Sequence, residues 1–283
     1  MSLLITAAEL AEEIADGNAL RILDVRWSLD RPDGRAEYRA GHIPGAVYVD
    51  LDTELAAHGA VTDGRHPLPS RQQLERAARS WGINSGDRVV AYDDLNNFSA
   101  ARAWWLLTHA GLDNVRLLDG SLRAWTAARY DLATGEEPAT PGTVDLGWDQ
   151  LPVTTLDEIA GLADTGVVLD SRAAERYRGD VEPIDPRAGH IPGALNAPAT
   201  GNIDAQGRFL PVDQLRERFL TVGVQPGRPV AVYCGSGVVA AHNVVALTLA
   251  GFAPALYPGS FSQWSNHADR SVAVGPAAGG GVE

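Results

Sequence analysis

The chain contains two copies of one eight-residue sequence, Arg-Ala-Gly-His-Ile-Pro-Gly-Ala, at residues 39–46 and 187–194. Eight identical letters in one order have a negligible probability of recurring by chance. A weaker repeat precedes each copy at a similar distance, because Leu-Asp-Val-Arg at 23–26 returns as Leu-Asp-Ser-Arg at 169–172. The sequence therefore predicts a tandem pair of related domains.

Each copy alternates short β-rich runs with helical patterns, which is typical of an α/β domain with a mainly parallel sheet flanked by helices. Thr6 with Glu9, and Thr155 with Glu158, are capping-box signals that open helices. The predicted strands lie at 21–25, 88–92, 167–170 and 229–233, and the predicted helices at 70–81, 212–222 and 239–250.

Composition sets the domain boundaries. Residues 136–151 are rich in Gly, Pro, Thr and acidic residues, which indicates a linker. We therefore predict a first domain at 1–135, a second at 152–275, and a disordered tail at 276–283.

Charge and composition exclude several function classes. The net charge is −13, with 36 acidic and 23 basic residues, and no stretch concentrates positive charge, so we expect neither nucleic acid nor a membrane as a partner. Every basic side chain other than histidine is arginine, which excludes Schiff-base chemistry on a lysine. One cysteine cannot form an internal disulfide, and the N-terminus lacks a signal-peptide pattern, so we expect a cytoplasmic protein.

The repeated Gly-His-Ile-Pro-Gly-Ala places His42 and His190 at equivalent positions, where a catalytic or a structural role is open. Pro and two Gly shape a tight turn, and a histidine between them can satisfy backbone groups. Both copies carry the histidine but only one has a cysteine, so we favour a structural role.

The single cysteine, Cys234, lies between the strand predicted at 229–233 and the helix predicted at 239–250. Gly235 and Gly237 allow successive N–H groups to turn inward, and the positive helix end adds to a field that favours an anion at the sulfur. Sites of α/β folds lie beyond the carboxyl ends of strands. The pattern predicts a nucleophilic thiolate, with a buried structural cysteine as the alternative.

A cysteine phosphatase has the same strand–loop–helix geometry. That chemistry needs an arginine six residues after the cysteine to hold the phosphate dianion, and Ala240 stands there. Phosphate hydrolysis is therefore a weak interpretation.

The tandem domains, the repeated Gly-His-Ile-Pro-Gly-Ala and the Cys-Gly-Ser-Gly-Val of residues 234–238 together resemble the rhodanese-type sulfurtransferases. Within that family the neutral loop is most similar to 3-mercaptopyruvate sulfurtransferases, because thiosulfate-specific members typically carry basic residues there. The chain departs from the mercaptopyruvate pattern at Val239, where Thr is commonest.

The resemblance implies that Cys234 carries a persulfide formed from 3-mercaptopyruvate and passes its sulfur to a thiol, cyanide or a thioredoxin-like protein. It implies no metal and no organic cofactor. Thiosulfate as the donor, and a sulfur-relay or binding module without turnover, are the alternatives.

The resemblance also assigns roles to particular residues. Ser236, Asp52 and His66 would handle protons beside the nucleophile, and Arg178 and Arg187 would bind the substrate's carboxylate and ketone. A surface ion pair is the alternative role for each arginine, and an ordinary loop position is the alternative for His66. The loop residues expected to contact the substrate are Gly235, Gly237, Val238 and Val239.

In the first repeat, Asp93 falls where the second has Cys234. A carboxylate there cannot carry sulfur. We therefore expect the first domain to be non-catalytic and to supply Asp52 and His66 to a cleft between the domains.

Overall fold

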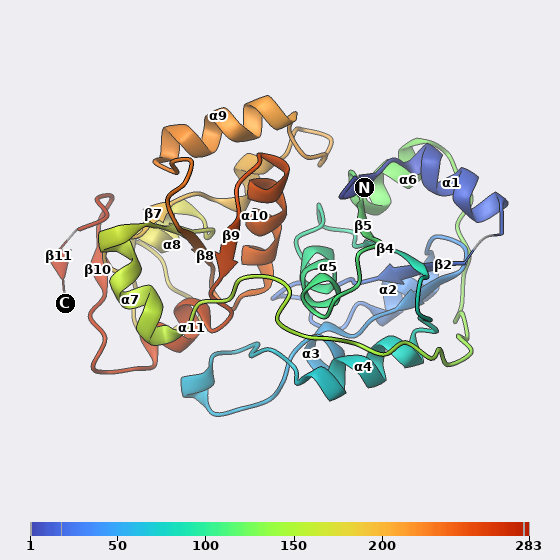
Figure 1. Ribbon diagram of the computed structural model, residues 1–283, viewed down its shortest axis with the longest axis horizontal. Helices are drawn as coiled ribbons and strands as arrows, with labels where there is room; N and C mark the ends of the chain where they lie inside the picture. The colour runs from blue at the N-terminus through green and yellow to red at the C-terminus, as the bar shows by residue number, and fades with distance from the viewer. Residues whose placement is uncertain (1, 18, 280, 283) are drawn as a thin grey trace. The chain divides into compact units, whose positions relative to one another are not determined.

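The computed structural model describes residues 2–17, 19–279 and 281–282, and it divides into two compact units (Figure 1). The first unit comprises Met1–Ala57, Leu68–Leu151 and Ile203–Phe209, and the second comprises His58–Pro67, Pro152–Asn202 and Leu210–Glu283. These bounds differ from the predicted domains in two segments, because 58–67 belongs to the second unit and 203–209 to the first.

The first unit is built on a five-stranded sheet in the order β1-β5-β4-β2-β3, and every neighbouring pair is parallel. Helices cover the sheet, as expected for parallel strands joined by crossover connections. The strands are β1 (Leu4–Ile5), β2 (Leu20–Asp24), β3 (Ala46–Tyr48), β4 (Arg88–Tyr92) and β5 (Val115–Leu118). The helices are α1 (Ala7–Ala15), α2 (Arg35–Ala40), α3 (Leu51–Glu54), α4 (Arg71–Ser80), α5 (Ala100–His109) and α6 (Ser121–Ala127).

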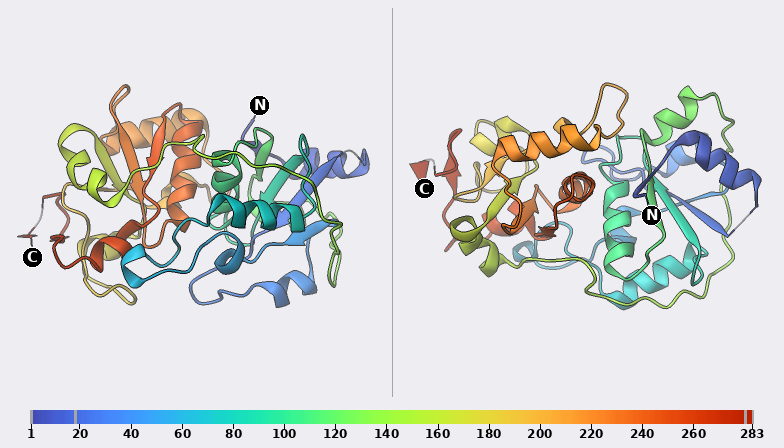
Figure 2. Two further views of the ribbon diagram at one scale, coloured as in Figure 1. Left: turned by 60° about the horizontal axis from the view of Figure 1, so that its bottom comes forward. Right: turned by 45° about the horizontal axis from the view of Figure 1, so that its top comes forward.

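The second unit repeats this plan with a four-stranded parallel sheet in the order β7-β6-β8-β9. Figure 2 shows α9 and α10 packed against one another beside this sheet. The strands are β6 (Val167–Asp170), β7 (Leu195–Asn196), β8 (Val230–Tyr233), β9 (Pro254–Leu256), β10 (Ala273–Val274) and β11 (Gly281–Val282). The helices are α7 (Leu156–Thr165), α8 (Ala174–Arg178), α9 (Val212–Val222), α10 (Val238–Leu249) and α11 (Ser260–Ser265), with 3₁₀ turns η1 (Val61–Asp63) and η2 (Ala199–Asn202).

The predicted α/β class is confirmed, and the predicted elements form within one or two residues of their expected ends. Both capping boxes are present. The Thr155 hydroxyl accepts from the Glu158 N–H at 3.3 Å and the Glu158 carboxylate accepts from the Thr155 N–H at 2.8 Å, with the same exchange between Thr6 and Glu9. These local bonds start α1 and α7 at the predicted residues.

The predicted linker at 136–151 contains no helix or strand, and it runs along the first unit. The Gly142 N–H donates to the Arg79 carbonyl at 2.7 Å, and Arg79 Nε donates to the Val144 carbonyl at 2.8 Å. The predicted disordered tail differs from the structure at β11, which pairs with β10 in an antiparallel ladder. Residues 280 and 283 of that tail lie outside the described residues. No described helix is long and apolar enough to cross a membrane.

The repeated histidines are structural, as the sequence analysis favours. His42 and His190 are fully buried and stack on Tyr38 and Tyr177, with ring centroids 4.1 and 3.8 Å apart. Each histidine places Nδ1 within 2.9 Å of the carbonyl of its tyrosine. The backbone of His190 also exchanges two hydrogen bonds with Ala273, which fixes the turn to β10.

A buried ion pair supports the motif in each unit. Arg172 holds the Asp170 carboxylate through Nε and Nη2, and Nη2 also donates to the Gly189 carbonyl at 2.7 Å. Arg26 makes the equivalent pair with Asp24 in the first unit. Buried charges need such complete pairing, so we interpret both pairs as parts of the scaffold.

The glycine before each histidine provides a test of this scaffold. Gly189 has φ +120°, and a Cβ there would lie 2.3 Å from the Ala273 carbonyl oxygen. Gly41 has φ 175°, an extended conformation open to any residue, and its Cβ would meet only the Leu132 side chain at 3.0 Å. We expect Gly189→Ala to lower the unfolding free energy of the second unit by about 3 kcal/mol. Gly41→Ala should cost the first unit about 1 kcal/mol or less. Hydrogen exchange of the β6 and β4 amides measures the two units separately, and equal losses would contradict this account.

Candidate active site at the Cys234 loop

Cys234 directly follows β8, whose four residues are all buried, and it precedes α10. Gly237, the residue before α10, has φ +80°, and a Cβ there would lie 2.3 Å from the Pro258 carbonyl oxygen. Only glycine fits this left-handed, crowded position. The result is a tight loop in which the Gly237 N–H donates to Cys234 Sγ at 3.2 Å.

The backbone of the cysteine is held from α11. The Cys234 N–H donates to Ser260 Oγ at 3.2 Å, and the Phe261 N–H donates to the Cys234 carbonyl at 3.0 Å. Cys234 is 4% exposed. Polar groups lie beside the same loop, because Ser236 belongs to it and two arginine side chains approach Gly235.

The first unit shows what this kind of loop can hold. Asp93 follows β4 as Cys234 follows β8, and the Leu122 N–H donates to its carbonyl at 3.0 Å as Phe261 does to that of Cys234. The fully buried Asp93 carboxylate accepts five hydrogen bonds, four from its own loop and one from a serine. Burial raises the pKa of Asp93, and the backbone N–H bonds oppose that rise. The donors are the N–H groups of Leu95, Asn97, Ser99 and Ala100 and the hydroxyl of Ser121, at 2.7 to 3.1 Å.

His66 and Ser236 meet at this site. His66 Nδ1 lies 2.8 Å from Ser236 Oγ, and both residues are buried. His66 belongs to the 58–67 segment, which packs as part of the second compact unit. The segment is anchored where the Arg65 N–H donates to Ser262 Oγ at 3.0 Å.

Two arginines lie beside the glycine that follows the cysteine. A Cβ on Gly235 would lie 2.9 Å from Arg65 Nη2 and 3.4 Å from Arg176 Nη1. Arg65 Nε is buried and has no hydrogen-bond partner within the described part of the chain. The two guanidinium groups therefore lie next to Gly235, the residue that follows Cys234.

Arg178 and Arg187, the arginines predicted to bind substrate, are engaged elsewhere. The Arg187 guanidinium donates to four backbone carbonyls, so it ties the chain together and has few donors left for a ligand. Arg178 is 38% exposed in its side chain and pairs with Asp180 at 2.7 Å. Substrate binding by Arg178 and Arg187 stays a prediction, and the two arginines that the structure places beside the cysteine loop are Arg65 and Arg176.

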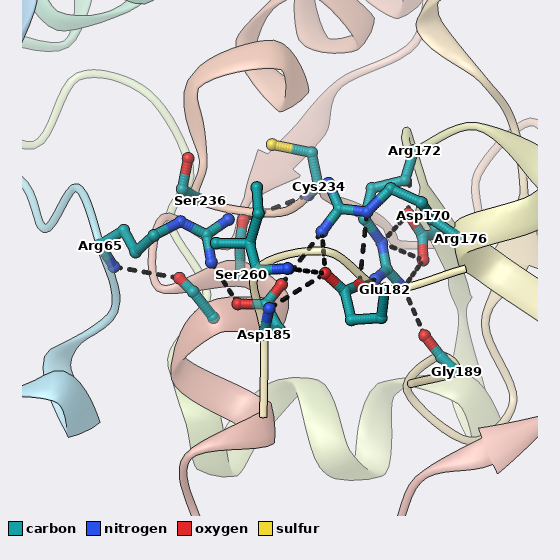
Figure 3. A network of polar contacts seen from close by, with 12 residues as sticks. Arg65, Asp170, Arg172, Arg176, Glu182, Asp185, Gly189, Cys234, Ser236 and Ser260 are labelled. Atoms are coloured by element: carbon teal, nitrogen blue, oxygen red, sulfur yellow. Dashed lines mark hydrogen bonds and ion pairs between the residues drawn. The ribbon is translucent and has the colours of Figure 1, made fainter. Parts of the chain in front are cut away.

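Two carboxylates neutralise these arginines, as Figure 3 shows. Asp185 lies between them, paired with Arg65 Nη1 and, at 3.2 Å, with Arg176 Nη2. Glu182 accepts from Arg176 Nη2 at 2.6 Å. Burial raises the pKa of Asp185, although the Arg65 charge acts against this. Burial also acts to raise the pKa of Glu182, but N–H donation from Asp185 and the Arg176 guanidinium outweigh it and hold that pKa below its usual range.

A pocket of about 370 Å³ opens beside Arg65 and Asp185. This volume suits a small metabolite. Its other lining residues are His58, Gly59, Ala60, Val61, Gly64, Ile184, Pro186 and Asn266.

The roles of the predicted site residues all stay predictions, including those of the remaining three. Asp52 lies in α3 of the first unit and is partly exposed, and its role in proton transfer stays a prediction. Val238 is buried at the start of α10, and Val239 is partly exposed. Their contact with substrate stays a prediction.

A family model described as the rhodanese-like domain matches residues 6–128 and 155–267. The chain belongs to the rhodanese-type sulfurtransferases. Both matched ranges fall on the repeated halves of the sequence, so the tandem repeat is confirmed.

Relatives of this rhodanese-type chain carry two kinds of name. SseB of Mycobacterium tuberculosis, provisionally named a thiosulfate sulfurtransferase, is 47% identical over 97% of this chain and 98% of its own length. A protein of Pseudomonas aeruginosa, provisionally named a 3-mercaptopyruvate sulfurtransferase, is 46% identical over 96% of this chain and 98% of its own length. The solved structure of SseA from Escherichia coli, a 3-mercaptopyruvate enzyme, matches with a TM-score of 0.82 and 33% identity over 92% of this chain and 99% of that one.

One signal in the sequence marks the segment beside Arg176, although nothing comparable points to Arg65. Tyr177 and His190 are 13 residues apart, whereas Tyr38 and His42 are four apart, so the second repeat has nine additional residues here. An insertion confined to the cysteine-bearing repeat is a candidate for function. It begins after the short helix α8, on which Arg176 and Arg178 point in different directions because they are two residues apart.

The positive charge beside Cys234 can be tested without any substrate. Iodoacetate is an anion and iodoacetamide is neutral, so the ratio of their alkylation rates reports the field at the thiolate. We expect Arg176→Ala to lower this ratio about fivefold, because one flanking cation is lost. The matched variant Arg178→Ala, on the same helix, should change it by less than about twofold. A larger effect of Arg178→Ala would favour Arg178 as the arginine that acts at the cysteine.

Proposed function

We propose that this chain transfers sulfane sulfur from 3-mercaptopyruvate to a thiol, cyanide or a thioredoxin-like acceptor through a persulfide on Cys234. The observation that carries the proposal is the placement of Cys234 Sγ, which accepts the Gly237 N–H beside two guanidinium groups at the carboxyl end of β8. A thiolate nucleophile and a carboxylate-bearing donor both suit this site.

In the first half-reaction, the Cys234 thiolate attacks the sulfur of 3-mercaptopyruvate. The Sγ–S bond forms, and the bond from that sulfur to carbon breaks with its electron pair on the carbon. An enolate of pyruvate results, and the proton of the donor thiol completes its methyl group. Cys234 is left as a persulfide anion, and the total charge is unchanged.

Arg65 and Arg176 would orient the donor. The guanidinium nitrogens beside Gly235, Arg65 Nη2 and Arg176 Nη1, would donate to the planar carboxylate and the neighbouring ketone and stabilise the charge that develops on the enolate oxygen. Holding the donor sulfur against Sγ supplies much of the acceleration by orientation alone. In this proposal they take the role that the sequence assigned to Arg178 and Arg187.

The proton moves through Ser236 and His66. Ser236 Oγ is two residues beyond the nucleophile and 2.8 Å from His66 Nδ1, so the pair can accept the donor's thiol proton and return it to carbon. Asp52 is proposed to assist, as the family resemblance implies.

In the second half-reaction an external nucleophile attacks the outer sulfur and restores the thiolate. Cys234 is the chain's one cysteine, so the persulfide cannot be resolved as an internal disulfide. Two half-reactions that share one covalent intermediate predict ping-pong kinetics.

Thiosulfate is the second candidate donor, and it is supported by the name of the SseB relative. The local charge favours mercaptopyruvate. The two arginines at the loop are opposed by Glu182 and Asp185, so little net positive charge is left for a dianion.

Cys234→Ser provides the decisive test. We expect the wild-type chain to gain the mass of one sulfur when it is mixed with 3-mercaptopyruvate, and to lose it again on addition of cyanide, because Sγ holds the transferred atom. The variant should gain nothing and turn over nothing. Intact-mass measurement with a panel of donors checks this. Turnover by the variant would refute the proposal, and a persulfide without turnover would favour a relay module.

Removing the hydroxyl of Ser236 tests the proton route. We expect Ser236→Ala to lower kcat for 3-mercaptopyruvate about a hundredfold with little change in KM, because the hydroxyl acts on the proton and does not hold the carboxylate. His66→Ala should behave alike. If the two act as one relay, the double variant loses no more than either single variant. Losses that multiply would contradict a shared route.

A further inference from the structure

We infer that Asp185 determines the donor preference of this site by disfavouring dianionic donors such as thiosulfate. The inference rests on the proposed sulfur transfer at Cys234 and adds a specificity residue to it. Asp185 does not touch the reacting sulfur. It acts by fixing one arginine and by setting the charge that the donor meets.

The geometry gives Asp185 control of both arginines. Its carboxylate bridges Arg65 and Arg176, and its side chain is only 1% exposed (Figure 3). The contacts use Arg65 Nη1 and Arg176 Nη2, whereas the atoms nearest Gly235 are Arg65 Nη2 and Arg176 Nη1. The nitrogens that face Gly235 can therefore donate to the carboxylate of a donor molecule. The carboxylate of Asp185 already lies between the same two arginines.

The charge of the cluster is balanced. Arg65 and Arg176 are countered by Glu182 and Asp185, and the nearby Arg172 is held by Asp170. The carboxylates of Glu182 and Asp185 are nearly inaccessible to water, so solvent screens their charge only weakly. Asp185 therefore repels an incoming dianion strongly.

The bridging aspartate belongs to the additional segment of the second repeat. Tyr177 and His190 are 13 residues apart there, against four for Tyr38 and His42 in the first repeat. The first unit makes the same stacking contact between its tyrosine and histidine although it lacks this segment. Asp185 is thus not needed to form the turn that carries the repeated histidine. Because charged side chains are seldom buried, we interpret its buried position between the two arginines as functional.

The two donors differ in the charge they bring and release. Mercaptopyruvate enters with one carboxylate, and its thiol proton ends on carbon, so pyruvate leaves as a monoanion. Thiosulfate enters as a dianion. When the Cys234 thiolate attacks its outer sulfur, the Sγ–S bond forms, the original S–S bond breaks, and the electron pair leaves on sulfite, again a dianion. With thiosulfate the second negative charge is present from binding to release, whereas with mercaptopyruvate it exists only in the enolate before the proton reaches carbon. Repulsion by Asp185 therefore disfavours thiosulfate more.

Asp185→Asn tests the inference, because it keeps the side-chain shape and removes the charge. We expect the ratio of kcat/KM for thiosulfate to that for 3-mercaptopyruvate to rise about tenfold. Asp180→Asn is the matched control, since Asp180 is exposed and pairs with Arg178 at the surface, and its ratio should stay at the wild-type value. An unchanged or lower ratio in folded Asp185→Asn, or an equal rise in Asp180→Asn, would overturn the inference.

A second measurement uses the wild type and does not depend on the variant folding. Pyruvate should protect Cys234 against iodoacetamide at lower concentration than sulfate does, because it carries one charge and sulfate carries two. Equal or better protection by sulfate would also overturn the inference. Failure of the proposed function is distinguishable, because then no donor adds sulfur to Cys234 in the intact-mass experiment.

Discussion

A loop that places backbone N–H groups around a buried anion is the feature on which the chemistry of this chain depends. In the first unit it holds the Asp93 carboxylate with four N–H groups, and in the second the Gly237 N–H reaches Cys234 Sγ. A buried anion is costly unless it is hydrogen-bonded. The repeat therefore supplies a position where N–H groups can hold negative charge, and in the second unit a cysteine stands there in place of the carboxylate.

Local signals made most of the fold predictable. Capping boxes fixed the starts of α1 and α7, and the all-apolar run before Cys234 gave β8. The repeat itself implied that both halves share one plan. Exchange of the 58–67 and 203–209 segments between the compact units was not predictable, because it depends on long-range packing that leaves no local pattern.

The cysteine loop was predictable because the backbone conformation of its glycines defines it. The side chains around the loop were not, because their positions depend on the directions in which they point. The glycines after Cys234 revealed the loop. The arginines beside the loop were not predictable, because spacing along the chain says little about where a guanidinium points. Arg187 has the right spacing, yet four carbonyls use its donors, whereas Arg65 comes from a distant part of the sequence.

The division between shared scaffold and added segment explains how donor preference can change without loss of the fold. The buried Asp170–Arg172 pair and the stacked His190 have counterparts in the first unit, so they belong to the architecture. Asp185 has no counterpart there. Because its partners Arg65 and Arg176 are themselves partly exposed, a substitution at Asp185 leaves cations that water can still reach. Removing the charge of Asp185 then destabilises only the contacts of the two arginines. The sheet and the cysteine loop keep their own contacts.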